Sequence, residues 1–318
     1  MGRTYANLGT ALNKLNEYDS SFVYFRKAFN AYDQSENHIL AENCLQHLAN
    51  THETVGSIDT AVRIFTEATD YNILHKNYPQ AVKNWIQISS VFVRAKNIPK
   101  AIEALNQAIA FTKDQELNNV YILYNRLANL YKKEGMYALA LENLQKAYDN
   151  LDSLNEVSEK KVNILIEIGW IHRDMNNPDI AQDYFERAMK LAEEHQLYER
   201  IYQIFGHFQT IFDAKGEYEQ LVESAKKALA YGEEHNIDRS KALFMNNMGD
   251  AYVKLGNTQL AIETLTASLI YARQTNNTFH IALALTTLAE AYMQKEDYST
   301  ALNYARESFA LRQLLGGI

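Results

Sequence analysis

Small and large apolar residues return along the chain at intervals of about forty residues. The segment from Leu127 to Ala147 shows the unit, with a small residue at Ala128, an aromatic ring at Tyr131 and another small residue at Ala140. When this segment is shifted by thirty-nine to forty-one residues in either direction, the same order of side-chain types appears again. Self-similarity at a fixed period is the mark of a repeat architecture. The pattern therefore predicts a chain built from eight similar units.

Each predicted unit holds three small side chains at fixed places. The first place reads Gly9, Ala49, Ser89, Ala128, Gly169, Gln209, Gly249 and Ala289, so that only Gln209 is large. The second reads Ser21, Ala61, Ala101, Ala140, Ala181, Leu221, Ala261 and Ala301, and the third reads Ala28, Ala68, Ala108, Ala147, Ala188, Ala228, Ser268 and Ser308. Two antiparallel helices need small side chains where their backbones approach and large ones around that point. We therefore expect an all-α fold of about sixteen antiparallel helices and no strand, with helix–turn–helix repeats at approximately 1–36, 37–76, 77–116, 117–155, 156–196, 197–236, 237–276 and 277–318.

Short polar turns separate the two helices of each predicted pair. Asp19, Asp59, Asp179 and Ser299 stand where an N-cap would satisfy the unpaired amides of the second helix. Pro99 fits the first turn of a helix. Between successive pairs, breaks rich in asparagine are expected at Asn37, Asn77 and Asn276-Asn277.

The order small, aromatic, alanine, phenylalanine, alanine resembles the tetratricopeptide repeat over essentially the whole chain, and Trp85 stands where that family often has tryptophan. The usual period of that family is 34 residues, with a proline closing the second helix. The proline position here holds Asp33, Ile73, Lys113, Asp152, Glu193, Glu233 and Arg273. This longer form resembles the repeats of kinesin light chains and of the bacterial peptide-sensing regulators that include the Rap proteins. The resemblance implies one right-handed α-solenoid domain over residues 1–318.

Charge, cysteine content and hydropathy narrow the classes of partner. The net charge of −8 argues against direct binding to nucleic acid, because phosphate recognition needs a basic face. Cys44 is the single cysteine, which fits a reducing compartment. No run of eighteen apolar residues occurs, so we expect a cytoplasmic chain without a membrane partner.

The two ends of the predicted array differ from its middle. The first helix starts almost at Tyr5, and the last repeat ends in Leu311, Leu314, Leu315 and Ile318 without a polar cap. Solenoids usually need a polar cap at each end. Either the chain is trimmed from a longer protein, or an uncapped end associates with another copy or another chain.

The sequence lacks the short motifs that carry common chemistry. Neither a phosphate-binding loop nor a nucleophile elbow nor a zinc-protease helix motif occurs. His47 and His52 are five residues apart, which does not place them on one helix face as a metal pair requires. Cys44 beside Leu45 fits an inert packing thiol. We therefore expect neither an enzyme nor a bound metal or cofactor.

The first helices of such repeats line a concave side, where the ligand of tetratricopeptide proteins usually lies. The places one, five, eight and nine residues after the aromatic position should face this groove. The residues selected as the partner-binding groove are Gln46, Asn50, Arg94, Asn125, Asn129, Lys132, Lys133, Trp170, Arg173, Asn246 and Asp250. An amide can pair with both the N–H and the C=O of a peptide, and asparagine is a mediocre helix former, so its recurrence there favours a peptide clamp. The alternative is that these are only solvated positions of a helix.

Two further features shape the predicted groove. Arg94, Lys132, Lys133 and Arg173 would form a basic middle, and Asp174, Asp213, Asp250 and Glu290 would form an acidic far half. A groove polarised in this way could orient an extended peptide. Trp170 either anchors a ligand or packs against a neighbouring repeat.

Two functions remain open from the sequence. The first is a scaffold or adaptor that holds a protein or peptide in the concave groove. The second is the sensory or regulatory domain of a bacterial signalling or transcription regulator, switched by a peptide or protein partner. The resemblance to the peptide-sensing regulators implies that an output domain would belong to such a protein.

Overall fold

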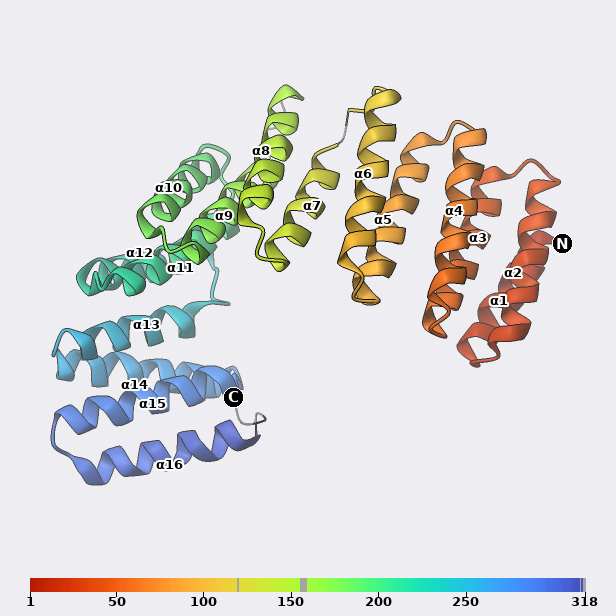
Figure 1. The fold of residues 1–318 in the computed structure, drawn as a ribbon. Coiled ribbons are helices and arrows are strands. Elements are labelled where there is room, and N and C mark those ends of the chain that lie inside the picture. The colour runs from red at the N-terminus through yellow and green to blue at the C-terminus, as the bar shows by residue number, and fades with distance from the viewer. Residues whose placement is uncertain (119, 155–158, 315, 317–318) are drawn as a thin grey trace. The chain divides into compact units, whose positions relative to one another are not determined.

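The chain folds into α-helices joined by short turns, as the repeat pattern predicts. The computed structural model describes residues 1–118, 120–154, 159–314 and 316, and over these residues it contains sixteen α-helices and no strand (Figure 1). The helices are α1 (Gly2–Lys14), α2 (Tyr18–Asp33), α3 (His38–Thr54), α4 (Ile58–Leu74), α5 (Tyr78–Arg94), α6 (Ile98–Asp114), α7 (Tyr121–Lys133), α8 (Tyr137–Ser153), α9 (Glu159–Asp174), α10 (Pro178–Glu194), α11 (Tyr198–Lys215), α12 (Tyr218–His235), α13 (Lys241–Lys254), α14 (Thr258–Gln274), α15 (Thr278–Gln294) and α16 (Tyr298–Leu314). The predicted all-α class is confirmed.

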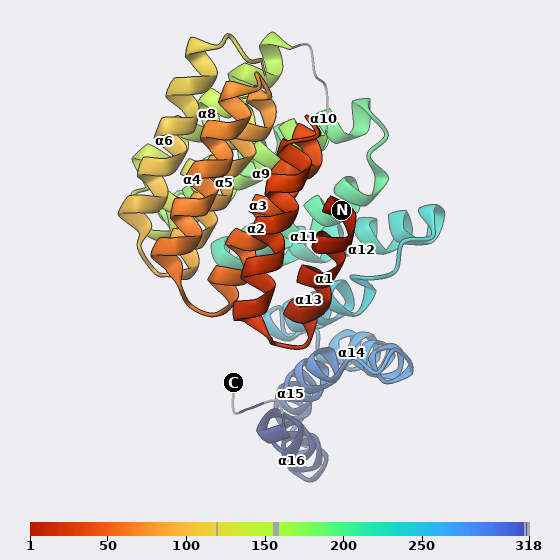
Figure 2. The ribbon, with the colours of Figure 1, turned by 90° about the vertical axis from the view of Figure 1, so that its right-hand side faces the viewer.

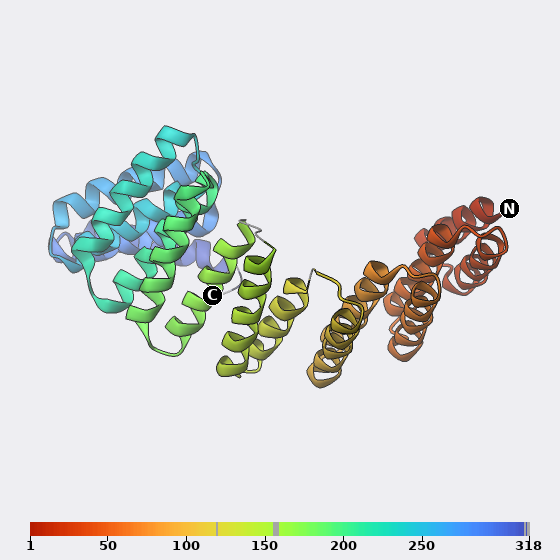
Figure 3. The same ribbon diagram turned by 90° about the horizontal axis from the view of Figure 1, so that it is seen from above.

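The chain divides into two compact units, residues 1–156 and residues 157–318. The first unit holds α1 to α8, and the second holds α9 to α16. Within the first unit each helix packs against the next, and the pairs follow one another in chain order (Figures 2 and 3). Within the second unit α13, α14, α15 and α16 lie side by side (Figure 1). The prediction of one domain over residues 1–318 stays a prediction.

Close approach of the two helices of a pair explains the small residues. A Cβ added at Gly9 would lie 2.8 Å from the Phe25 ring, and one added at Gly249 would lie 2.4 Å from Leu265. Ala140, at the second small place, has no exposed surface. The predicted alternation of small and large residues at the helix crossings is therefore confirmed by packing.

Asparagines mark the breaks between helix pairs, as predicted. The side chain of Asn37 accepts a hydrogen bond from the Leu40 amide at 3.2 Å, and that of Asn277 accepts one from His280 at the same distance. Pro99 is the second residue of α6, as expected for a proline in the first turn of a helix. Over the described residues, no helix has both the length and the apolar composition that crossing a membrane requires.

The predicted N-caps of the second helices are shifted by two residues. Asp19, Asp59, Asp179 and Ser299 are each the second residue of their helix, so they do not cap it. Glu17, Ser57 and Asn177 take the N-cap position instead, because α2, α4 and α10 begin directly after them. Three of the four predicted residues are acidic and still favour the positive end of the helix dipole.

Candidate functional site

A pocket of about 500 Å³ opens between α5, α6 and α7 in the first unit. Its lining combines apolar, amide and basic side chains, namely Ser89, Ser90, Val93, Arg94, Leu105, Ile122, Asn125, Arg126, Asn129, Leu130 and Lys133. Four of these residues, Arg94, Asn125, Asn129 and Lys133, belong to the groove predicted from the sequence. The structure therefore brings these four side chains together at one pocket.

The two asparagines of α7 interact with each other across one helical turn. The Asn129 side-chain amide donates to the Asn125 backbone oxygen at 3.1 Å and to Asn125 Oδ1 at 3.2 Å. Asn129 is exposed and Asn125 is half-buried. These bonds use neither Nδ2 of Asn125 nor Oδ1 of Asn129. One donor and one acceptor therefore stand next to each other at the wall of the pocket.

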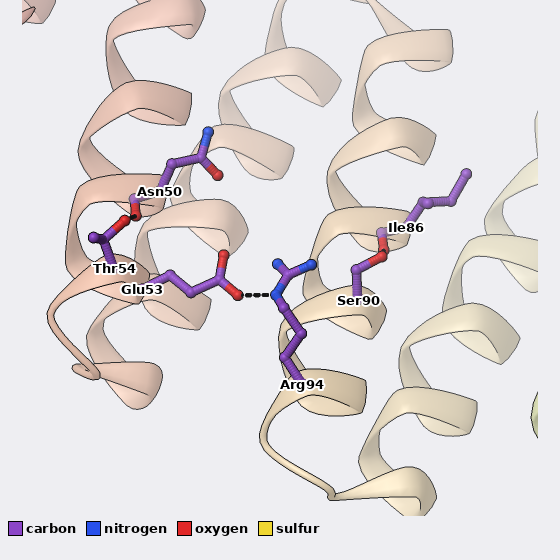
Figure 4. A network of polar contacts seen from close by, with 6 residues as sticks. All are labelled: Asn50, Glu53, Thr54, Ile86, Ser90 and Arg94. Carbon is purple, nitrogen blue, oxygen red and sulfur yellow. Dashed lines mark hydrogen bonds and ion pairs between the residues drawn. The ribbon is translucent and has the colours of Figure 1, made fainter. Parts of the chain in front are cut away.

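The basic side of the pocket comes from two helices. Lys133 and Arg126 extend from α7, and Arg94 extends from the last turn of α5. Arg94 Nε donates to Glu53 of α3 in an ion pair (Figure 4). The Arg94 side chain is 56% exposed and that of Glu53 is 16% exposed, so this guanidinium stays accessible while it is partly neutralised.

Arg126 and Ile122 line the pocket, but the sequence analysis missed them. The pocket face of α7 follows the spacing of one helix stripe, at 122, 125, 126, 129 and 133. Lys132 was predicted for this face, but it is half-buried and is not among the described residues that line the pocket. The stripe itself was the available signal. Ile122 precedes Tyr124, the aromatic position from which the groove places were counted, and Arg126 falls between the counted places.

Gln46 and Asn50 of α3 lie away from this pocket. The Gln46 amide donates to Glu42 Oε1 at 2.8 Å and to Asn84 Oδ1 at 3.3 Å. Glu42 is 3% exposed and Asn84 has no exposed surface, so Gln46 belongs to a polar cluster between α3 and α5. Asn50 is exposed, and its backbone oxygen accepts a bond from Thr54 (Figure 4).

In the second unit, Trp170 is a packing residue. Its ring meets Phe185 of α10 at 5.3 Å and His207 of α11 at 4.8 Å between ring centroids. The Arg173 guanidinium covers the indole at 4.1 Å and pairs with Asp174 at 2.6 Å. Of the two alternatives left open by the sequence, packing against a neighbouring repeat therefore matches the observed contacts.

Asn246 is inside the core, which corrects its placement in the predicted groove. It is 1% exposed, its Oδ1 accepts from Ser268 Oγ at 2.7 Å, and its Nδ2 donates to the His280 backbone oxygen at 3.2 Å. The amide therefore satisfies partners within the fold, because a buried polar group needs them. It does not face a ligand.

Asp250 lies half-buried on α13 in an acidic setting. Burial raises its pKa, and the carboxylates of Asp213 and Glu290 raise it further, while Lys254 opposes them. These carboxylates come from α11, α13 and α15 of the second unit. Asp213, Asp250 and Glu290, which were predicted for the acidic half of the groove, therefore influence one another within the second unit.

Cys44 fits the predicted packing role. Its side chain is buried, and burial raises the pKa of the thiol to about 11. The thiolate is the nucleophilic form, so this cysteine stays unreactive near neutral pH.

Models of the tetratricopeptide repeat match residues 2–32, 119–194 and 240–313. Response regulator aspartate phosphatase I of Bacillus subtilis (strain 168) is 23% identical in a 220-residue alignment that covers 65% of this chain and 54% of that protein. The chain thus spans about half the length of this curated relative.

Solved structures share the fold at low sequence identity. The apo form of RapI aligns with a TM-score of 0.65 at 18% identity, over 86% of this chain and 76% of that one. A signal-transduction ATPase with a tetratricopeptide repeat sensor from Pyrococcus horikoshii aligns with a TM-score of 0.69 at 14% identity, over 99% of this chain and 48% of that one. Aspartyl phosphate phosphatase F from Bacillus subtilis aligns with a TM-score of 0.56 at 17% identity, over 92% of this chain and 76% of that one. Because the repeat models cover more than half of the sequence, the chain belongs to the tetratricopeptide repeat family.

Proposed function

We propose that the chain is a binding module that holds an extended acidic peptide segment in the pocket between α5, α6 and α7. The observation that carries this proposal is the amide pair of α7. Asn125 offers a donor and Asn129 offers an acceptor at the pocket wall, and a peptide unit presents the complementary C=O and N–H. Amides that pair with the backbone bind without regard to the peptide's side chains.

The charged side chains around these two amides determine which side chain of a bound peptide the pocket prefers. Arg126, Lys133 and the partly neutralised Arg94 surround the same pocket. Guanidinium groups pair well with carboxylates, because their donors match the two carboxylate oxygens. An aspartate, a glutamate or a terminal carboxylate of the ligand is therefore the favoured group. Leu105 and Ile122 supply apolar surface for the stem of a ligand side chain.

We assign binding rather than catalysis to this pocket. Among the residues that the structure describes, the lining includes two hydroxyls, of Ser89 and Ser90, and no histidine or carboxylate that could activate one. The Ser90 hydroxyl donates to the Ile86 backbone oxygen at 2.9 Å (Figure 4). A nucleophile needs an adjacent base within hydrogen-bonding reach.

A regulatory role is the second candidate. It draws support from the similarity to a protein named response regulator aspartate phosphatase I and from the shared fold with a repeat described as a sensor. In this version the bound peptide changes how the chain acts on a partner protein. If the chain is only a binding module, a bound peptide should not change its affinity for other proteins. If the chain is regulatory, a bound peptide should change its affinity for another protein.

Selection from a displayed library of linear peptides tests the binding proposal. Peptides enriched on the wild-type chain should contain an acidic residue. Asn125→Ala and Asn129→Ala should weaken their binding by about five- to one-hundred-fold, because the peptide group left behind is unpaired. Asn50→Ala is the matched control, since it removes an exposed asparagine of α3 outside the pocket. If all three variants bind these peptides as tightly as the wild type does, with helical content unchanged, this pocket is not the binding site.

A further inference from the structure

Three metal-ligating side chains meet at one end of the helices α2, α3 and α4. Asp33 is the last residue of α2, His38 is the first residue of α3, and His75 follows the last residue of α4. Antiparallel packing brings these helix ends together, because α3 starts where α2 and α4 stop. One potential ligand atom from each of the three side chains lies within 4.8 Å of the other two.

Tyr71 of α4 connects two of these side chains through its hydroxyl. The hydroxyl donates to Asp33 Oδ1 at 2.8 Å and lies 2.9 Å from His38 Nδ1. A phenol has one proton, so the hydroxyl accepts from His38 while it donates to Asp33. His38 then carries its proton on Nδ1, and its Nε2 keeps a free lone pair. Histidine ligands of metals are oriented in this way, by donating their other ring nitrogen to an oxygen.

The third side chain stacks on this arrangement. The His75 ring lies 3.7 Å from the His38 ring between centroids, at an interplanar angle of 21°, and 4.4 Å from the Tyr71 ring. Both imidazoles are half-buried, and Asp33 is exposed. The cluster is therefore reachable from solvent.

We propose that Asp33, His38 and His75 bind one divalent transition-metal ion of the zinc class. The ligands would be a carboxylate oxygen of Asp33, Nε2 of His38 and a ring nitrogen of His75, with a fourth position open to water or to a further ligand. Two imidazoles and a carboxylate suit zinc and its neighbours, whereas magnesium and calcium prefer sites made of oxygen alone. The site lies outside the pocket of the proposed function and does not depend on that function.

Binding requires a defined rearrangement. Ligand atoms of a tetrahedral zinc site lie about 3.4 Å apart, given bond lengths of roughly 2.1 Å. One potential ligand atom of each side chain now lies within 4.8 Å of the other two, so the ligand atoms must approach further. Two rings that share one ion also cannot stay stacked face to face. The His75 ring must therefore turn away from His38 when the metal binds.

Titration of the full chain with Zn²⁺, without a histidine tag, tests the site. The wild type should bind one ion with the highest affinity, and His38→Ala, His75→Ala and Asp33→Asn should each weaken that step by at least about tenfold. Tyr71→Phe should weaken it by about tenfold, because the oriented tautomer is lost. Millimolar Mg²⁺ should not compete.

His195→Ala is the matched control for the zinc titration. His195 follows α10 at the place that His75 holds after α4, three repeats further on, and it is exposed. This variant should bind as the wild type does. Proton NMR of the wild type should show the ring signals of His38 and His75 shifting together as Zn²⁺ is added. Undiminished binding by His38→Ala and His75→Ala, or no one-to-one step in the wild type, would overturn the proposal and leave the cluster as hydrogen-bonded packing.

Discussion

Gly169 of α9 lies against the ring of Phe185 in α10, so close that an added Cβ would be 2.5 Å from Phe185 Cε1. Real Cβ atoms do not reach such a distance, and Phe185 is fully buried. Gly169→Ala should therefore overpack the helix crossing and lower the free energy of unfolding by about 1–3 kcal/mol. Urea denaturation monitored by circular dichroism measures the change.

Gly206→Ala is the matched control for this substitution. Gly206 lies inside α11 of the same unit, and its added Cβ would be 3.4 Å from Phe244, which is ordinary contact. Alanine is the better helix former, so this variant should be as stable as the wild type or more stable by up to about 1 kcal/mol. Equal stability of the two variants would show that the crossing of α9 and α10 tolerates a methyl group.

Asn246 should act as a core residue. Its amide bonds Ser268 Oγ and the His280 backbone oxygen in a buried setting. Asn246→Ala leaves both without this partner and should cost about 1–3 kcal/mol of unfolding free energy. Gln259→Ala, which removes an exposed amide of α14, should change stability by less than about 0.5 kcal/mol. If Asn246→Ala and Gln259→Ala had the same small effect on the urea midpoint, Asn246 would not stabilise the core.

His207 should make stability depend on pH. Burial lowers its pKa to about 4, and the Arg173 and Arg200 charges contribute. In the unfolded chain the His207 imidazole has a pKa near 6.5, so it binds a proton more readily than in the folded chain. The contribution of His207 to stability is therefore fully present above about pH 6.5 and falls as the pH drops towards 4. The loss attributable to this half-buried residue is at most roughly 3 kcal/mol.

His207→Phe separates this effect from other titrations. Phenylalanine keeps a ring against Trp170 and Phe185 but cannot take up a proton. Unfolding free energies measured by urea between pH 4 and pH 7.5 should fall less steeply for the variant than for the wild type. Parallel pH profiles would mean that His207 does not titrate in this window.

The repeat pattern predicted most of the fold because it reports helix packing directly. Gly169 and Phe185 stand in different helices, yet their small and large side chains recur with the same period as the helix pairs. The predicted N-caps lie two residues after the observed ones. Capping depends on the exact turn geometry, and the sequence alone does not show which of the polar residues near the turn, such as Glu17 or Asp19, directly precedes the helix.

The candidate site was predicted less well, because it depends on whether a side chain lies on the core face or on the exposed face of its helix. Asn246 seemed equivalent to Asn125, but Ser268 replaces the alanine that most repeats carry at the third small place. The Ser268 hydroxyl gives Asn246 a buried partner, so this serine was the signal that distinguished the two asparagines. The cluster of His38 with His75 lies at helix ends, where the repeat signature says nothing about which side chains meet.

The Glu53–Arg94 ion pair should limit the affinity of the pocket for acidic ligands. Glu53 holds Arg94 Nε and cancels part of its charge beside the pocket (Figure 4). Glu53→Gln keeps a hydrogen-bond acceptor of the same size but removes the charge. Because the Arg94 side chain is 56% exposed, water screens the pair, which should contribute about 0–1 kcal/mol, so its loss should change stability little. The freed guanidinium should raise the affinity for an acidic peptide by about two- to fivefold.

Titrations of one selected acidic peptide at low and high salt measure the effect of Glu53→Gln. The gain should shrink in 0.5 M NaCl, because screening weakens the attraction between the peptide carboxylate and Arg94. Glu142→Gln is the control, since Glu142 pairs with Lys146 on α8, outside the pocket lining. It should leave the affinity unchanged. If Glu53→Gln binds the peptide no better than the wild type at low salt, Arg94 does not contact the ligand, and the acidic group must be held by Arg126 or Lys133.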